Sequence, residues 1–320
     1  MLLKYLNTNQ PPVLFLLPFF TALLWTPFLL YPVTPDSHIV TTYVMLFKHD
    51  LVLDGLEGTI AAFVVSNLTA IVFNRLINST DLCNKPSYIY AFVYVLIEAC
   101  LRTNTGFYSW QLSQLFVLAA LWPLLRIYNQ QQVIDRGFEV GLIMAIACFL
   151  FEPAVIFFVM VPVFLQVFRT FNWREWLFPF IGFGLIFSFY ACYRLLTGQP
   201  FFTFFIIQKF DFNAYYTMQT YTLAACVVVI LLGMISYFKG AQRVVMHARK
   251  QRQVLLFTFI ITTTLLTLLN YNGFIYAPYF IVAGIGSLFA GYYFGNNRFK
   301  TLTEVVFLGI VAVQLLRYNI

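Results

Sequence analysis

The chain has 320 residues, of which 61% are hydrophobic and only 10% are charged. Soluble domains carry about 25% charged residues, so this composition excludes a water-soluble globular protein and indicates that lipid is the main solvent. The formal net charge of +7 comes without a basic run interleaved with aromatic residues, which excludes a nucleic-acid-binding surface.

Apolar segments follow one another along the whole chain. A membrane span needs about 20 apolar residues, and somewhat fewer inside a bundle, so we predict an all-α polytopic integral membrane bundle of about 11 spans, within a range of roughly 9 to 12. Residues 1–320 are predicted to form one transmembrane domain. The spans are predicted at residues 12–32, 59–77, 87–101, 108–127, 137–151, 154–168, 176–196, 221–238, 254–269, 275–294 and 302–316.

The first apolar segment is interpreted as a span rather than a cleaved signal. Lys4 is the only charged residue before it, its apolar run is long, and no small-x-small cleavage site follows. A second feature of the segmentation is a break at Glu152-Pro153, because proline lacks an N–H and disfavours helical geometry in the residue before it. The two short segments on either side of this break are predicted to form a hairpin.

The basic residues divide unevenly between the two ends of the predicted bundle. With the N-terminus inside, the inner connections carry Lys4, Arg75, Lys85, Arg126, Arg136, Arg169, Arg174, the basic run 239–252, Arg298 and Lys300. The outer connections carry only Lys48, Arg102, Arg194, Lys209 and Arg317. This asymmetry follows the positive-inside rule and predicts a bacterial inner-membrane protein with an inner N-terminus. The run 239–252 is interpreted as a contact with anionic headgroups.

Two outer connections are long enough to carry a function, a juxtamembrane segment at residues 33–58 and a loop at residues 198–219. The first is rich in acids and histidines, namely Asp36, His38, His49, Asp50, Asp54 and Glu57. Carboxylates at a membrane surface can accept a proton from an attacking hydroxyl or hold a divalent cation together with phosphate oxygens. The alternative is a solvated connection whose charges only keep it out of lipid.

Further ionisable residues are predicted at the same outer end. Glu98 and Arg102 lie four residues apart on one helix face. They form either a structural ion pair or a phosphate contact in which Glu98 orients Arg102. Arg194, near Tyr190, either extends to the interface or holds a lipid phosphate. Glu152, at the tip of the hairpin, belongs to the same constellation as Arg194, and Lys209 and Asp211 in the following loop are weaker candidates of the same kind.

The sequence encodes no clear cofactor site. The five cysteines are scattered without CxxC spacing, which favours buried apolar roles over disulfides or metal ligation. No P-loop, HExxH, GxSxG or dinucleotide-binding pattern is present, and no pair of histidines within the spans could hold haem. A divalent cation at the outer acids is the one cofactor that these residues suggest.

The arrangement resembles the GT-C class of membrane glycosyltransferases. The similarity lies in Pro35-Asp36 after the first span, the stretch FKHDLVLDGLEG before the second, and RGFEVG at 136–141 followed by the hairpin broken at Glu152-Pro153. It implies transfer of a sugar from a polyprenyl-phosphate carrier on the outer, periplasmic face, with Asp36 as catalytic base and Asp50 or Asp54 as substitutes. In this sequence Ser37 follows Asp36, so the paired acids frequent in that class are absent.

The resemblance also implies positions for the substrate. The carrier phosphate would lie near Arg102 or Arg194, with His38, Glu57, Glu98, Glu152 and Lys209 as further substrate-binding candidates. The middle third, through RGFEVGL and FNWREW, is also similar to an uncharacterised family of bacterial polytopic membrane proteins. Two other functions stay open. One is a non-catalytic subunit of an envelope complex, with membrane protein partners. The other is a transporter, which would be expected to show repeated halves.

Overall fold

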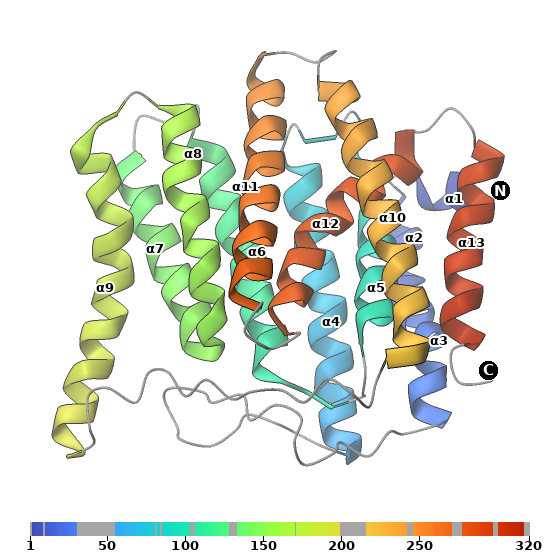
Figure 1. Cartoon of the computed structure of the whole chain (residues 1–320), viewed down its shortest axis with the longest axis horizontal. Helices are drawn as coiled ribbons and strands as arrows, with labels where there is room; N and C mark the ends of the chain where they lie inside the picture. Colours follow the sequence, from blue (N-terminus) through green and yellow to red (C-terminus); the bar gives the residue numbers. More distant parts are fainter. Residues whose placement is uncertain are drawn as a thin grey trace.

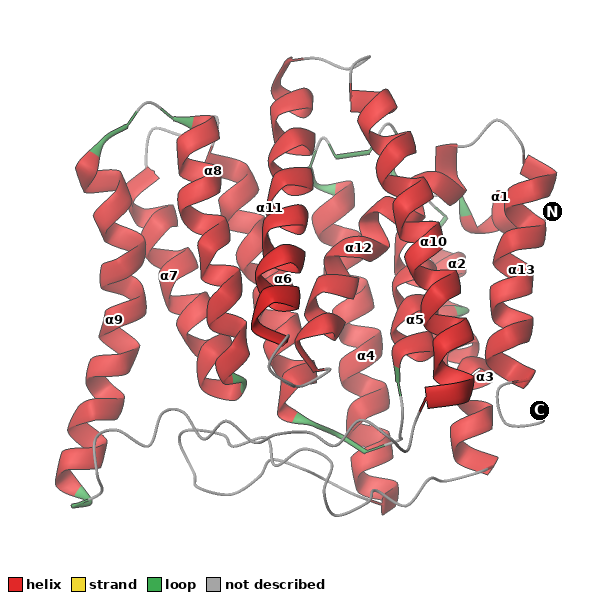
Figure 2. Ribbon diagram, viewed as in Figure 1, coloured by secondary structure: helices red, strands yellow, loops and turns green. Residues whose placement is uncertain are grey.

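The computed structural model describes residues 2–8, 10–30, 55–80, 82–83, 85–102, 106–127, 133–169, 171–198, 216–241, 246–270, 277–296 and 300–316. The regular elements within these ranges are helices (Figure 2), so the all-α prediction is confirmed for the described part of the chain. They are α1 Leu2–Leu6, α2 Pro11–Phe15, α3 Leu17–Leu30, α4 Gly55–Asn78, α5 Ile89–Leu101, α6 Ser109–Arg126, α7 Val133–Leu150, η2 Glu152–Val159, α8 Met160–Phe168, α9 Trp173–Leu196, α10 Tyr216–Ala241, α11 Met246–Asn270, α12 Ala277–Asn296 and α13 Lys300–Leu316.

Each predicted apolar segment coincides with helix in the structure. The first covers α2 and α3, and the sixth covers the 3-10 helix η2 together with α8. The predicted break is found where α7 ends at Leu150 and η2 begins at Glu152, with Pro153 in its first turn. Proline is tolerated there because the first N–H groups of a helix have no partner within the helix.

Successive segments cross the bundle in alternating directions (Figure 1). The end at which α3, α5 and α9 finish and α4, α6 and η2 begin is called the outer end below, and it is the lower end in Figure 1. The opposite end is called the inner end. Between them α5 is the most enclosed element, since every residue from Ile89 to Cys100 is buried. It packs against α3, α4, α10 and α12, and a helix that is apolar on all sides requires such surroundings.

Glycines allow two helix pairs to approach closely. In the pair α7 and α9, a Cβ added at Gly141 would overlap the carbonyl oxygen of Pro179, and one added at Gly182 would overlap the carbonyl oxygen of Phe138. In the pair α10 and α12, a Cβ at Gly233 would overlap the carbonyl oxygen of Phe289. Small residues at such crossings bring the two backbones into van der Waals contact. This packing drives helix association where the hydrophobic effect does not contribute, as in lipid.

By length and composition, two of the described helices, α4 and α9, are long and apolar enough to cross a membrane. They differ in their surroundings, because 50% of the apolar window of α4 is buried but only 17% of that of α9. Helix α9 lies at one edge of the bundle (Figure 1) and packs mainly on α7. Its outward side chains are large and apolar, among them Phe180, Leu185, Phe189 and Leu196.

Candidate functional site

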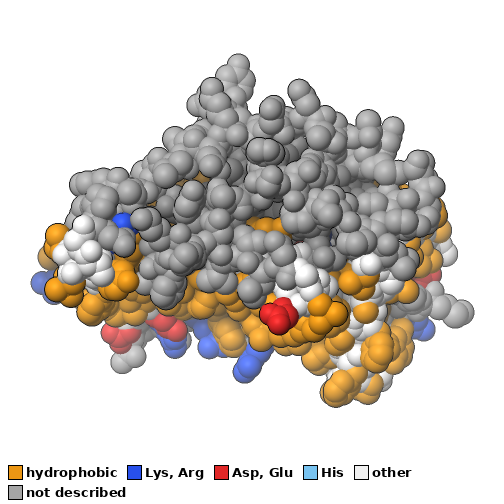
Figure 3. All heavy atoms as spheres, turned by 90° about the horizontal axis from the view of Figure 1, so that it is seen from below, with side chains coloured by type: hydrophobic (Ala, Val, Ile, Leu, Met, Phe, Trp, Pro, Cys, Tyr) orange, Lys and Arg blue, Asp and Glu red, His pale blue; other side chains and the backbone are white. Residues whose placement is uncertain are grey.

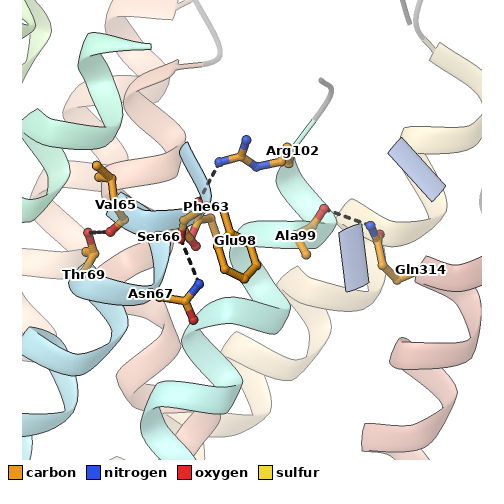
Figure 4. Close-up of polar contacts among 9 residues, drawn as sticks. All are labelled: Phe63, Val65, Ser66, Asn67, Thr69, Glu98, Ala99, Arg102 and Gln314. Carbon is orange, nitrogen blue, oxygen red and sulfur yellow. Dashed lines mark hydrogen bonds and ion pairs between the residues drawn. The ribbon is translucent and has the colours of Figure 1, made fainter. Parts of the chain in front are cut away.

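A buried ion pair lies at the outer end of α5. Arg102 Nη2 is 3.1 Å from Glu98 Oε1, and the two side chains are 1% and 4% exposed. Ser66 of α4 donates a hydrogen bond of 2.5 Å to the other carboxylate oxygen of Glu98 (Figure 4). The Arg102 guanidinium lies over the ring of Trp25, 4.0 Å from its centroid. Three helices, α3, α4 and α5, therefore meet around one arginine, and we call Trp25, Ser66, Glu98 and Arg102 the outer polar cluster.

A second layer of hydrogen bonds fixes α3 against α4. Thr21 Oγ1 lies 2.9 Å from the carbonyl oxygen of Leu17 and 3.0 Å from Asn67 Oδ1. Asn67 Nδ2 donates to the carbonyl oxygen of Phe63 at 2.8 Å. The Phe63 ring meets the Trp25 ring edge-on, with centroids 5.6 Å apart. These contacts hold the indole in the position that the Arg102 guanidinium requires.

Two glutamine side chains donate hydrogen bonds to carbonyl groups in the last turns of buried helices. Gln314 of α13 donates to the carbonyl oxygen of Ala99 at 3.1 Å, in the last turn of α5 (Figure 4). Gln251 of α11 donates to the carbonyl oxygen of Leu125 at 3.0 Å, in the last turn of α6. The last four carbonyl groups of a helix have no partner within the helix, so both glutamines supply donors that the sequence neighbours do not.

The structure describes only some of the predicted site residues. Of the ten candidates, Asp36, His38, Asp50, Asp54 and Lys209 lie outside the described residues, as does the side chain of Glu152. Glu57 lies in the first turn of α4 and is exposed. The described side chains seen from the outer end are mainly hydrophobic, with few acidic and basic groups among them (Figure 3).

The structure places Arg194 away from the outer polar cluster. Its Nε donates to Tyr190 Oη at 2.7 Å, and it lies on α9, which packs mainly on α7. Arg102 instead ends α5, among α3 and α4. The two arginines share one end of the bundle but occupy different helix neighbourhoods, so they do not form a single phosphate site.

A described hollow in the bundle is apolar. It lies between α6, α7, η2 and α8, has a volume of about 10 Å³, and its lining includes Leu121, Met144 and Phe157. A cavity of this size barely holds one water, and an apolar one stays dry. No group of three or more His, Cys, Asp or Glu side chains within the described ranges could hold a metal ion.

A second buried arginine was not predicted from the sequence. Arg252 lies at the inner end of α11 and is 0% exposed, although the basic run around it suggested contact with lipid headgroups. Its guanidinium lies over the rings of Tyr237 in α10 and Tyr292 in α12, 5.4 Å from each centroid. We call these three residues, with Cys83 and Tyr90, the inner arginine cluster, because Cys83 interacts with both Tyr90 and Arg252.

The Cys83 thiol, in the connection between α4 and α5, is expected to be unreactive in the folded protein. Burial raises its pKa to about 12, against the lowering effects of the Tyr90 hydrogen bond and the Arg252 charge. Because the thiolate is the reactive form, maleimide should label a variant that keeps only Cys83 roughly 1,000-fold more slowly at pH 8 when folded than when unfolded in SDS. The folded rate should rise with pH. Equal rates in the two states would contradict the protected thiol.

The raised pKa of Cys83 also predicts how the stability of the protein changes with pH. The unfolded thiol, with a pKa of 9.0, loses its proton at lower pH than the folded thiol. Stability contributed by this group is therefore present below about pH 9 and is lost as the pH rises toward 12.

A comparison with protein families matches residues 28–319 to the model of a family of unknown function, DUF6427. The chain belongs to this family. The match begins near the end of α3 and runs to residue 319, so it includes Ser66, Glu98, Arg102 and the inner arginine cluster, whereas Trp25 lies just before it. No curated protein and no solved structure matches the chain.

Proposed function

We propose that this DUF6427 protein is an integral protein of a bacterial inner membrane, with eleven spans and its N-terminus inside. The separation of basic residues between the two ends of the bundle supports this orientation. Those in described helices and connections at the inner end are Lys4, Arg75, Lys85, Arg126, Arg136, Arg169, Arg174, Lys239, Arg249, Lys250, Arg252 and Lys300, against Arg102 and Arg194 at the outer end. Such an excess on one side is what the positive-inside rule expects.

We further propose that the protein transfers a sugar from a polyprenyl-phosphate carrier to an acceptor on the outer face, as GT-C-type enzymes do. One observation carries this proposal. The acidic connection, residues 31–54, joins the outer ends of α3 and α4, and these are the two helices that pack around Arg102. The segment containing Asp36, Asp50 and Asp54 is therefore joined at both ends to helices that contact the Glu98–Arg102 pair.

In the proposed chemistry, Asp36 acts on the acceptor and Arg102 acts on the leaving phosphate. Asp36 accepts the proton of an acceptor hydroxyl, whose oxygen attacks the anomeric carbon of the sugar. The bond from that carbon to the carrier phosphate breaks, and the phosphate leaves with the electron pair. Arg102 stabilises the charge on the departing phosphate, and Glu98 with Ser66 holds the guanidinium in place. Attack opposite the leaving group inverts the anomeric configuration.

An activity assay on the purified protein tests this proposal. With radiolabelled polyprenyl-phosphate sugars, Asp36→Asn is expected to lower the transfer rate by about 100-fold or more, since a positioned general base contributes about 10²–10⁴-fold. Glu139→Gln is the control, because Glu139 pairs with Arg136 at the inner end, where the pair is partly exposed. Undiminished transfer by Asp36→Asn would remove Asp36 from the mechanism.

A non-catalytic membrane subunit is the second candidate function. The observation in its favour is the outer edge of α9, whose large apolar side chains are exposed along most of the helix. A partner helix could cover this face in place of lipid. Stoichiometric co-purification of a membrane protein that is lost when Phe180 and Phe189 are replaced by alanine, with no transferase activity, would favour this function over the enzyme.

A further inference from the structure

The first turn of α6 contains buried polar atoms that are not used for folding. Ser109 is 0% exposed and Gln111 is 3% exposed. The Ser109 hydroxyl and both the nitrogen and the oxygen of the Gln111 amide have no hydrogen-bond partner in the described structure. A buried polar group without a partner costs about 1–3 kcal/mol, so three such atoms in one turn call for an explanation.

The first turn of α6 has no side-chain cap, and the Gln111 N–H donates to the Tyr108 carbonyl oxygen at 3.0 Å. Helix α6 begins after Tyr108, whose side chain makes no capping hydrogen bond. The first N–H groups of a helix have no partner within the helix, and they give the N-terminus a partial positive charge. A helix N-terminus that is uncapped and surrounded by buried donors is suited to an anionic group.

Helix α12 connects the level of Gln111 on α6 with the level of the Arg102 pair on α5. Gln111, Gln114 and Leu118 lie on one face of α6, and an added Cβ at Gly284 of α12 would lie 2.7 Å from Gln114 and 3.6 Å from Leu118. The same point lies 3.6 Å from the ring of Tyr94 in α5. One turn further toward the outer end, Gln111 follows on α6 and Glu98 follows on α5.

A second contact links the same two regions. Tyr108, which precedes α6, is close enough to Arg102 for their charges to interact. Arg102 is itself 1% exposed, so its charge acts in a region from which water is largely removed, where electrostatic interactions are stronger. The indole nitrogen of Trp25 in the outer polar cluster is a further buried donor without a hydrogen-bond partner among the described residues.

We infer that the first turn of α6, with Arg102, is a binding site for a hydroxyl-bearing phosphate ester. The phosphate would accept hydrogen bonds from the α6 N-terminus, and its negative charge would be attracted by the Arg102 guanidinium. A hydroxyl group both donates and accepts, so it satisfies the Gln111 oxygen and nitrogen together. The identification of this ester as the glycosyl phosphate of a donor rests on the proposed function. The site itself rests on Ser109, Gln111 and the uncapped helix.

Binding to the purified full-length protein in detergent tests the inference without requiring transfer. Glucose 1-phosphate, glycerol 1-phosphate, glucose and inorganic phosphate are the probes, and the dissociation constant is measured by calorimetry. Gln111→Leu is expected to weaken binding of glucose 1-phosphate by about tenfold or more, through the loss of two hydrogen bonds. Binding of inorganic phosphate should change by less than about threefold, because Arg102 and the helix N-terminus remain.

Stability provides the second readout. Gln111→Leu should leave the midpoint of thermal unfolding unchanged or raise it in the absence of ligand, because it removes buried polar atoms that have no partners. Gln251→Leu is the matched control. Its amide nitrogen donates to the Leu125 carbonyl at the inner end, so this variant should unfold at a lower temperature and bind glucose 1-phosphate normally.

The outcomes separate the inference from the proposed function. Gln111→Leu with lowered stability and unchanged affinity for glucose 1-phosphate would overturn the inference, even if the enzyme transfers sugar. Gln111-dependent binding in a protein without transferase activity would support the site and overturn only the enzyme. Equal Gln111-dependent binding of glycerol 1-phosphate, reproduced as stabilisation in phosphatidylglycerol but not phosphatidylcholine nanodiscs, would support the site and identify its ligand as a phospholipid headgroup.

Discussion

Replacing Glu98 by leucine is expected to destabilise the protein by about 3–5 kcal/mol, the usual cost of leaving one member of a buried ion pair without its partner. Arg102 would keep its charge next to Trp25 and lose the carboxylate 3.1 Å away. The double variant Glu98→Leu with Arg102→Met is expected to recover most of this loss, because it removes both buried charges together. Denaturant unfolding of the purified protein in mixed micelles measures the two effects.

An exposed pair provides the control for this cycle. Arg136 and Glu139 form a 2.8 Å ion pair near the inner end, with side chains 36% and 47% exposed. The corresponding variants Glu139→Leu and Arg136→Met should each change stability by less than about 1 kcal/mol. If Glu98→Leu is no more damaging than Glu139→Leu, the outer polar cluster does not stabilise the fold. A stable double variant at positions 98 and 102 that cannot bind inorganic phosphate would show that Arg102 has a ligand role as well.

The second large effect is expected where α9 crosses α7. Gly182→Val should destabilise the protein by about 3 kcal/mol or more, because the new side chain would overlap the Phe138 carbonyl, and backbone atoms cannot move aside as a side chain can. Helix α9 packs mainly on α7, so the loss of this crossing should release the helix from the bundle. The fraction of monodisperse protein after detergent extraction, together with proteolysis of α9, measures the result.

Gly184 gives a control on the same helix. An added Cβ at Gly184 meets no atom within 4 Å, so Gly184→Val should change stability by less than about 0.5 kcal/mol. Valine is also no worse a helix former than glycine. If Gly182→Val and Gly184→Val behaved alike, the effect would come from valine in α9 and not from the contact with α7.

Some parts of the fold could be predicted because they depend on local sequence alone. The length and apolar character of each segment predict a buried helix. Pro153 predicts the break before η2. The pairing of Glu98 with Arg102 followed from their spacing on one helix. These properties need no knowledge of which helices become neighbours.

The partners across helices could not be predicted in the same way. Ser66 and Trp25 reach Glu98 and Arg102 only because α3 and α4 pack on α5 at particular rotations. The basic residues around Arg252 in the sequence predict a contact with lipid headgroups. Arg252 is buried because Tyr237 and Tyr292 lie on helices that precede and follow α11. Gln111 belongs to no motif, and its significance appears only when its burial is known.

The enclosure of α5 bears on how the protein is made. Its 13 residues extend for only about 20 Å, less than the thickness of a bilayer core of about 30 Å. Two of the helices that surround it, α10 and α12, are synthesised more than a hundred residues later. In the proposed membrane topology α5 is therefore inserted with α3 and α4 but before α10 and α12, and a nascent chain that stops before α12 should remain bound to insertion factors or be degraded.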